Sequence, residues 1–250
     1  MTLQDIFRRV CRVACLTALG AACVLALTGC ATQADTVAAP AGEDARPPAA
    51  SERTTAPPPA PEPTVTIAWQ PSHQDDTGVD WHEYVVCGDI VDRVIALLPE
   101  YAHVKAWDTQ HGLTGTNNYR PAPTNTPAFD AELAMANEAS AHVFVSVHVD
   151  GGAPSGILGE CMPGDAASRR LTEALVASVC AQTGLPNRGV REVRLYSLES
   201  ERNLAPLRVL LELGDNAADR DLLMSEEGRD SLAAALAAAM QEAVPPDTTF

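Results

Sequence analysis

The sequence predicts a single α/β domain, in which helices cover both faces of a mostly parallel or mixed central sheet. Two observations predict this fold class. Strand and helix signals alternate along residues 65–245. Residues 143–147 and 209–213 are apolar on nearly both faces, as strands covered on both sides of a sheet are. The composition adds that the core must be aliphatic, because 46% of the residues are hydrophobic and only 4% are aromatic.

Short runs of β-branched and other apolar residues, bounded by turn-forming residues, predict the strands. In chain order they are residues 65–69, 103–107, 143–148, 156–161, 193–197 and 207–213. A long loop at residues 108–125, rich in Gly, Asn, Thr and Pro, follows the second of these strands. Loops of this length often carry function.

Apolar residues at spacings of three and four predict the helices between these strands. In chain order they are residues 80–98, 126–139, a helix that ends at Gly184, and residues 225–243. Asp80 can cap the first helix. Thr126 followed by Pro127 is typical of a helix start, and Gly184 suits the C-terminal cap of the third helix.

The N-terminal region predicts an export signal and a membrane anchor. Residues 1–29 combine an Arg-containing start with an uncharged apolar stretch at 13–28. That stretch is short for a spanning helix, which needs about 20 residues, and is typical of a secretory signal. It ends in Leu-Thr-Gly-Cys, which resembles a bacterial lipobox and implies that Cys30 is lipidated. The alternative is a plain signal cleavage site with an incidental cysteine.

A tether and one domain are expected after the signal. Residues 31–64 contain ten Ala and eight Pro and no aromatic residue, so this stretch cannot bury enough apolar surface to become ordered. We therefore expect residues 30–64 to be a disordered tether and residues 65–245 to be the ordered domain. This arrangement predicts a protein of the cell envelope, lipid-anchored on the outer side of the cytoplasmic membrane, or of the outer membrane if the organism has one.

Charge and cysteine content exclude two classes of protein. Lys and Arg number 17 against 33 Asp and Glu, for a net charge of -16. Nucleic acid is therefore not an expected partner, since binding it depends on basic residues that neutralise phosphates. Cys87, Cys161 and Cys180 are the cysteines outside the signal and lipobox. These three cysteines can form one disulfide or remain three free thiols, and both possibilities stay open. A scaffold built on several disulfides is excluded.

Four polar residues are expected at the carboxyl ends of the strands, where ligands gather in open α/β sheets. His73 follows the first strand, His148 ends the third and Glu212 lies near the end of the last. Glu83 lies in the first turn of the first helix, on its apolar stripe. Two imidazoles and a carboxylate suffice for a catalytic zinc site, which uses three protein ligands and leaves one position open.

Each of these residues also has a purely structural explanation. Glu83 lies three residues after Asp80, where a capping-box glutamate would lie. His73 could be an ordinary loop residue, and His148 a hydrogen-bonded core residue. Glu212 is harder to explain structurally, because an unpartnered carboxylate in an apolar strand is costly.

The order of elements and three segments resemble the zinc-dependent N-acetylmuramoyl-L-alanine amidases, the amidase type 3 family of peptidoglycan hydrolases. The resemblance covers residues 65–244. Residues 136–150 are similar to the family's Ala-Asn, Ala-Asp and Ser-x-His-x-Asn/Asp run, and residues 209–214 to its apolar strand ending in Glu-x-Gly. Residues 187–191 resemble the family's Arg-Gly-Val stretch.

The resemblance implies that His73, Glu83 and His148 bind zinc and that Glu212 is the catalytic carboxylate. The implied reaction is hydrolysis of the amide bond between N-acetylmuramic acid and L-alanine in peptidoglycan, by a monomer. Two other functions remain open: a non-catalytic peptidoglycan-binding lipoprotein of this fold, and a related zinc peptidase that cleaves the stem peptide.

The sequence departs from the family pattern at several positions. Ser72-His73-Gln74-Asp75 replaces the usual Gly-His-Gly-Gly, Glu132 replaces a common Arg, and Asp215 replaces a common aromatic residue. These departures bear on how the substrate fits more than on metal binding. Asp150 and Asp76 are candidates for the groups that hold the histidine ligands.

Overall fold

The computed structural model describes residues 63–74, 82–108 and 126–250, which all belong to one compact unit. The predicted signal, lipobox and tether, including Cys30, lie outside the described residues. The strands are β1 (Thr66–Pro71), β2 (Ala102–Lys105), β3 (Val143–Asp150), β4 (Ile157–Cys161), β5 (Asn187–Glu192) and β6 (Leu207–Asp215). The helices are α2 (Glu83–Leu97), α3 (Thr126–Glu138), α4 (Ala166–Thr183), α5 (Arg220–Met224), α6 (Glu226–Ala243) and the 3-10 helix η1 (Tyr196–Leu198).

The strands form one mixed sheet in the order β2-β1-β3-β6-β4-β5. The β1–β2, β1–β3 and β3–β6 pairs are parallel. β4 runs antiparallel to β6, and β5 runs parallel to β4. The predicted fold class, a single α/β domain with a mostly parallel or mixed sheet, is therefore confirmed.

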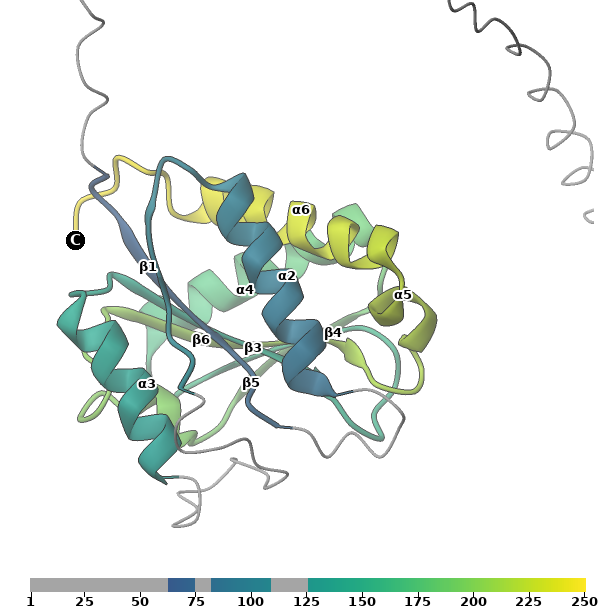
Figure 1. Cartoon of the computed structure of the whole chain (residues 1–250), viewed down its shortest axis with the longest axis horizontal. Coiled ribbons are helices and arrows are strands. Elements are labelled where there is room, and N and C mark those ends of the chain that lie inside the picture. Colours follow the sequence, from purple (N-terminus) through teal and green to yellow (C-terminus); the bar gives the residue numbers. More distant parts are fainter. Residues whose placement is uncertain (1–62, 75–81, 109–125) are drawn as a thin grey trace, which may run out of the picture. The chain divides into compact units, whose positions relative to one another are not determined.

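Helices cover both faces of the sheet, as Figure 1 shows. On one face, alternate residues of β1, β3 and β6 pack against α2, α4 and α6 in an aliphatic core. On the other face, a smaller cluster joins Ala68, Phe144 and Leu210 to α3 and to the segment around η1. Because successive strand residues point to opposite faces, His148 and Glu212 share the face of Phe144 and Leu210.

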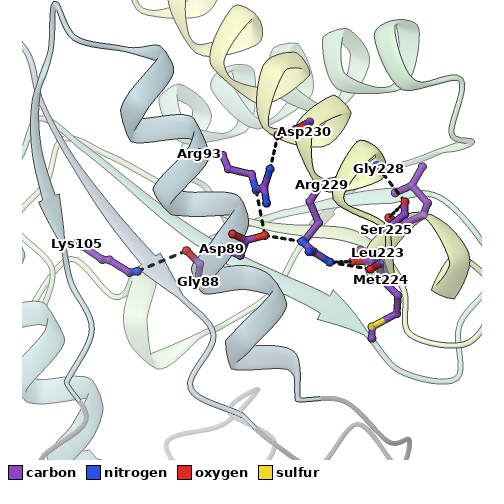
Figure 2. A network of polar contacts seen from close by, with 11 residues as sticks. Gly88, Asp89, Arg93, Lys105, Leu223, Met224, Ser225, Gly228, Arg229 and Asp230 are labelled. Carbon is purple, nitrogen blue, oxygen red and sulfur yellow. Dashed lines mark hydrogen bonds and ion pairs between the residues drawn. The ribbon is translucent and has the colours of Figure 1, made fainter. Parts of the chain in front are cut away.

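Helix α2, which begins at Glu83, is fixed to the C-terminal helices by a polar network (Figure 2). The carboxylate of Asp89 accepts hydrogen bonds from Arg93 and from Arg229 of α6. Arg229 also donates to the carbonyl oxygens of Leu223 and Met224, at the end of α5, at 3.0 Å each. These contacts hold α2 in place beside α5 and α6, and thereby hold the start of α2 at one end of the sheet.

Helix α4 is fixed at both of its ends and along its side. Asp165 caps its N-terminus by accepting from the backbone N–H of Ser168 at 3.0 Å. Gly184 caps its C-terminus in the left-handed conformation, as predicted. Gly159 of β4 lets the helix approach, since a Cβ atom there would lie 2.2 Å from Cγ2 of Thr172.

Two details of the predicted elements are wrong. Residues 193–197 are not a strand: the strand is β5 at Asn187–Glu192, and η1 follows. β5 is an edge strand with mostly exposed or half-exposed residues, so it lacks a strong apolar pattern. The apolar residues after it, such as Leu195, instead pack as a turn against the α3 cluster. The short helix α5 was not predicted.

Other boundaries agree to within a few residues. The first helix begins at Glu83 in the described part of the chain, and its proposed cap, Asp80, lies outside it. The three described cysteines, Cys87, Cys161 and Cys180, are all free thiols. In the part of the chain that the structure describes, no helix is both long and apolar enough to cross a bilayer.

Candidate active site

The centre of the candidate site is a pair of residues on adjacent parallel strands. His148 of β3 and Glu212 of β6 are direct partners in the register of the two strands, and both side chains are buried. The register shifts immediately after this pair. Gly214 follows with φ of 138°, a conformation that suits glycine, and β6 resumes its pairing with β3 at Asp215, which faces Asp150.

Glu83 reaches this pair from the first turn of α2. Its Oε1 lies 3.1 Å from Nδ1 of His148 and accepts a hydrogen bond of 3.1 Å from the backbone N–H of Val149. The backbone N-cap of α2 is His82, which makes no side-chain cap hydrogen bond. Within the described residues, then, the Glu83 carboxylate serves the end of β3 and not a capping box.

Burial controls the protonation of the two central groups. Burial raises the pKa of Glu212 to about 8, and the neighbouring Glu83 adds to this rise, whereas His148 opposes it. Burial alone would lower the pKa of His148, but its hydrogen bond with Glu83 raises it. Oε2 of Glu212 is buried with no hydrogen-bond partner among the described residues. An unpaired buried carboxylate oxygen is costly, which favours a functional role for it.

His73 approaches from the end of β1 and has one free ring nitrogen. The side chain is 1% exposed, and Nδ1 lies 3.2 Å from Oε1 of Glu132 on α3. The ring packs against Phe129, with 4.3 Å between centroids. Nε2 is buried and has no hydrogen-bond partner among the described residues. A lone imidazole nitrogen in this position is a potential metal ligand.

The residues fit a zinc ion by their chemistry. His73 Nε2 and Glu212 Oε2 are unpartnered, and the His148–Glu83 contact joins an imidazole to a carboxylate. Imidazole nitrogens and carboxylate oxygens are the donors that zinc takes in catalytic sites. Among the described residues, however, no group of three His, Cys, Asp or Glu side chains is close enough to hold a metal ion. Glu83 and His148 are thus brought together, and His73 does not close the set.

His142 and His103 make structural contacts away from this site. Nδ1 of His142 accepts from the backbone N–H of Thr66 at 3.0 Å. His103 lies between the indole N–H of Trp69, at 3.1 Å, and the carbonyl oxygen of Leu98, at 2.8 Å. The fold accounts for both side chains.

The groups that hold the histidines differ from those expected. Asp150 is paired with Arg188 at 2.7 Å, and Asp76 lies outside the described residues. The carboxylate beside His73 is Glu132, which the sequence singled out only as a departure from the family pattern. Its position on the buried stripe of Phe129, Leu133 and Ala136 was the available signal, because a glutamate on such a stripe needs a donor.

Asp215, another departure from the family pattern, has a structural task. The side chain is 1% exposed and accepts hydrogen bonds from the backbone N–H groups of Ala153, Ala217 and Ala218. It therefore ties the loop after β3 to the loop after β6, three residues beyond Glu212 in the sequence.

Comparison with known proteins identifies the family. The sequence pattern of the N-acetylmuramoyl-L-alanine amidases matches residues 89–242, a segment that contains His148 and Glu212. The chain belongs to this family. The match begins after His73 and Glu83 and therefore does not include these two candidate residues. No curated protein matches the amidase.

Solved amidase structures share its fold at low sequence identity. An N-acetylmuramoyl-L-alanine amidase from Clostridium difficile 630 aligns with a TM-score of 0.59 at 16% identity, covering 74% of this chain and 98% of that one. The CwlD amidase from Clostridioides difficile, solved in complex with the GerS lipoprotein, aligns with a TM-score of 0.60 at 17% identity, over 73% and 100% of the two chains. Ami1 from Mycobacterium smegmatis gives 0.56 at 21% identity, over 74% and 98%.

Proposed function

We propose that this amidase is a zinc-dependent enzyme that hydrolyses the amide bond between N-acetylmuramic acid and the L-alanine of the stem peptide. One observation carries the proposal. His148 and Glu212 are register partners at the carboxyl ends of adjacent strands, and Oε2 of Glu212 is buried with no hydrogen-bond partner among the described residues.

The proposed zinc ligands are His73, Glu83 and His148. Zinc supplies Lewis acidity in such a site, since it acidifies water and polarises a carbonyl group. Glu212 accepts the proton of the attacking water and delivers it to the departing nitrogen. The C–N bond breaks, the hydroxyl group stays on the lactyl carbonyl carbon, and the proton leaves on the amine of L-alanine.

The environment of Glu212 suits a general base. Glu212 is 4% exposed and lies in a strand of aliphatic neighbours. Its carboxylate is therefore shielded from bulk water. A general base works best when its pKa is near the working pH, and burial moves Glu212 in that direction.

We further propose that Cys30 anchors the protein by a lipid at the outer side of the bacterial membrane, with residues 30–64 as the tether. The basis is the lipobox-like sequence and the Pro- and Ala-rich composition. A lipid anchor would hold the enzyme near its polymeric substrate despite a net charge of -16, which does not favour anionic lipid.

Product analysis tests the reaction. Purified muropeptides are incubated with the full-length chain, with and without a zinc chelator, and the products are identified by mass spectrometry. We expect intact stem peptides with a free N-terminal L-alanine, no products with chelator, and recovery on addition of zinc. Cleavage inside the stem peptide would show a peptidase. Binding without any product would show a peptidoglycan-binding lipoprotein, and either result would overturn the proposal.

A further inference from the structure

A buried carboxylate connects His73 to the interior of the domain. Glu132 of α3 is 0% exposed. Its Oε2 accepts a hydrogen bond of 2.6 Å from the side-chain amide of Gln70, and its Oε1 accepts one of 3.3 Å from the backbone N–H of Asp108. Nδ1 of His73 lies 3.2 Å from Oε1 and 3.3 Å from Oε2.

The backbone shows that Glu132 is an acceptor, because the N–H of Asp108 can only donate to its Oε1. The amide nitrogen of Gln70 donates to Oε2 of Glu132, and the hydroxyl of Ser146 donates to the amide oxygen of Gln70 at 2.7 Å. Ser146 and Gln70 are register partners on β3 and β1, which makes the sheet itself the support for this orientation. Glu132 therefore receives hydrogen bonds from the amide and from the backbone, and it acts as an acceptor.

An acceptor beside Nδ1 determines which nitrogen of His73 carries the hydrogen. Neutral imidazole has one donor and one acceptor nitrogen. With the hydrogen on Nδ1 and donated to Glu132, the lone pair is on Nε2, the buried nitrogen without a partner. The opposite tautomer would place two acceptors face to face at Nδ1 and leave an unsatisfied N–H at Nε2.

We infer that Glu132 is a positioning residue, which holds His73 in the Nδ1–H form and so leaves the Nε2 lone pair available to a metal ion. The metal part of this inference rests on the proposed function, whereas the tautomer does not. Carboxylates that accept from a ligating histidine fix its tautomer and ring orientation.

The tautomer is measured first, in the metal-free, full-length wild-type chain. Nitrogen-15 NMR of the imidazole ring, with the His73 signals assigned by their loss in His73→Gln, distinguishes protonated from unprotonated nitrogens. We expect a protonated Nδ1 and an unprotonated Nε2. A protonated Nε2 with an unprotonated Nδ1 would overturn the inference, whether or not the protein binds zinc or cleaves peptidoglycan.

The effect on the metal is measured next, by chelator competition with zinc. Glu132→Gln should weaken zinc binding about 10- to 100-fold, as loss of such partners does, and should shift the His73 nitrogen signals. Glu138→Gln removes the same charge from an exposed position of the same helix and should change neither. Equal zinc affinity in Glu132→Gln and wild type would overturn the inference.

If Glu132→Gln does not fold, the wild-type NMR result alone decides, since it needs no variant at that position. The outcomes also separate this inference from the proposed function. A wild-type chain that binds no zinc contradicts the proposed function, and its His73 tautomer still tests the contact with Glu132.

Discussion

A buried polar atom without a hydrogen-bond partner costs free energy, so each such atom in a candidate site needs an explanation. Two such atoms are Nε2 of His73, just after β1, and Oε2 of Glu212 on β6, and these two strands lie on either side of β3. His148 lies on β3 itself, in contact with Glu83. At the scale of single residues, the proposed mechanism requires that His73, Glu83 and His148 bind one zinc ion and that Glu212 acts on the substrate bond beside it.

Replacing His148 should remove the metal. We expect His148→Ala to lose most of its zinc, because a site with three protein ligands would keep two. Elemental analysis of the purified, folded variant measures this against about one zinc per wild-type chain. His142→Ala is the matched control, since His142 contacts Thr66 and Phe250 and not the site, and should keep its zinc. A zinc-free wild type with full activity would contradict the assignment.

At the scale of elements, the site is held by the helices that fix the ends of the strands. Asp165 caps α4 and also pairs with Arg208 of β6 at 2.8 Å. The hydroxyl of Ser168 accepts from the backbone N–H of Arg208 at 2.9 Å. The start of α4 is thereby joined to the strand that carries Glu212.

This cap predicts a pH-dependent contribution to stability. Burial alone would raise the pKa of Asp165, but hydrogen bonds from Ser168 and the charge of Arg208 lower it below its usual value. A lowered pKa in the folded state stabilises the protein above the unfolded-state pKa, and this stabilisation is lost as pH falls through the folded-state value.

Asp165→Ala should cost about 1 kcal/mol at pH 7, equivalent to a fall in Tm of about 2–4 °C for a domain of this size. The difference in Tm between wild type and Asp165→Ala should shrink when thermal unfolding is repeated near pH 3. An equal difference at both pH values would show that the ionised carboxylate contributes nothing.

At the scale of the whole molecule, the fold class could be predicted from the order of the elements and from which strands are apolar on both faces. Alternating strand and helix signals and the doubly apolar β3 and β6 predicted a mostly parallel or mixed sheet, and the structure has a mixed one. The edge strand β5 was misplaced, because its residues are mostly half-exposed or exposed and local packing, not periodicity, determines where it lies.

The candidate site was predictable only in part. His148, Glu212 and Glu83 could be placed together because strand ends and the first helical turn meet at one edge of a sheet. Glu132 could not be recognised as the partner of His73, since the two residues are 59 positions apart and meet only through the packing of α3 on β1. Sequence periodicity describes one element at a time and does not show such contacts.

The lipid anchor is also a property of the whole molecule. Cys30→Ala should block lipidation, so that the chain is released from the membrane or accumulates unprocessed. Membrane fractionation and metabolic labelling with a fatty acid measure this. Unchanged fractionation of the variant, together with no lipid label on the wild type, would contradict the lipoprotein proposal.

The most direct test of the central claim is the turnover of zinc-loaded Glu212→Gln. The amide is nearly isosteric with the carboxylate and removes a buried charge, so the variant should fold, and His73, Glu83 and His148 should still hold zinc. Glu227→Gln, an exposed change on α6, is the control and should keep wild-type activity. Turnover of muropeptides by Glu212→Gln should fall about a hundredfold or more, within the range of general acid–base catalysis. Activity within a few-fold of wild type in folded, zinc-loaded Glu212→Gln would contradict the account.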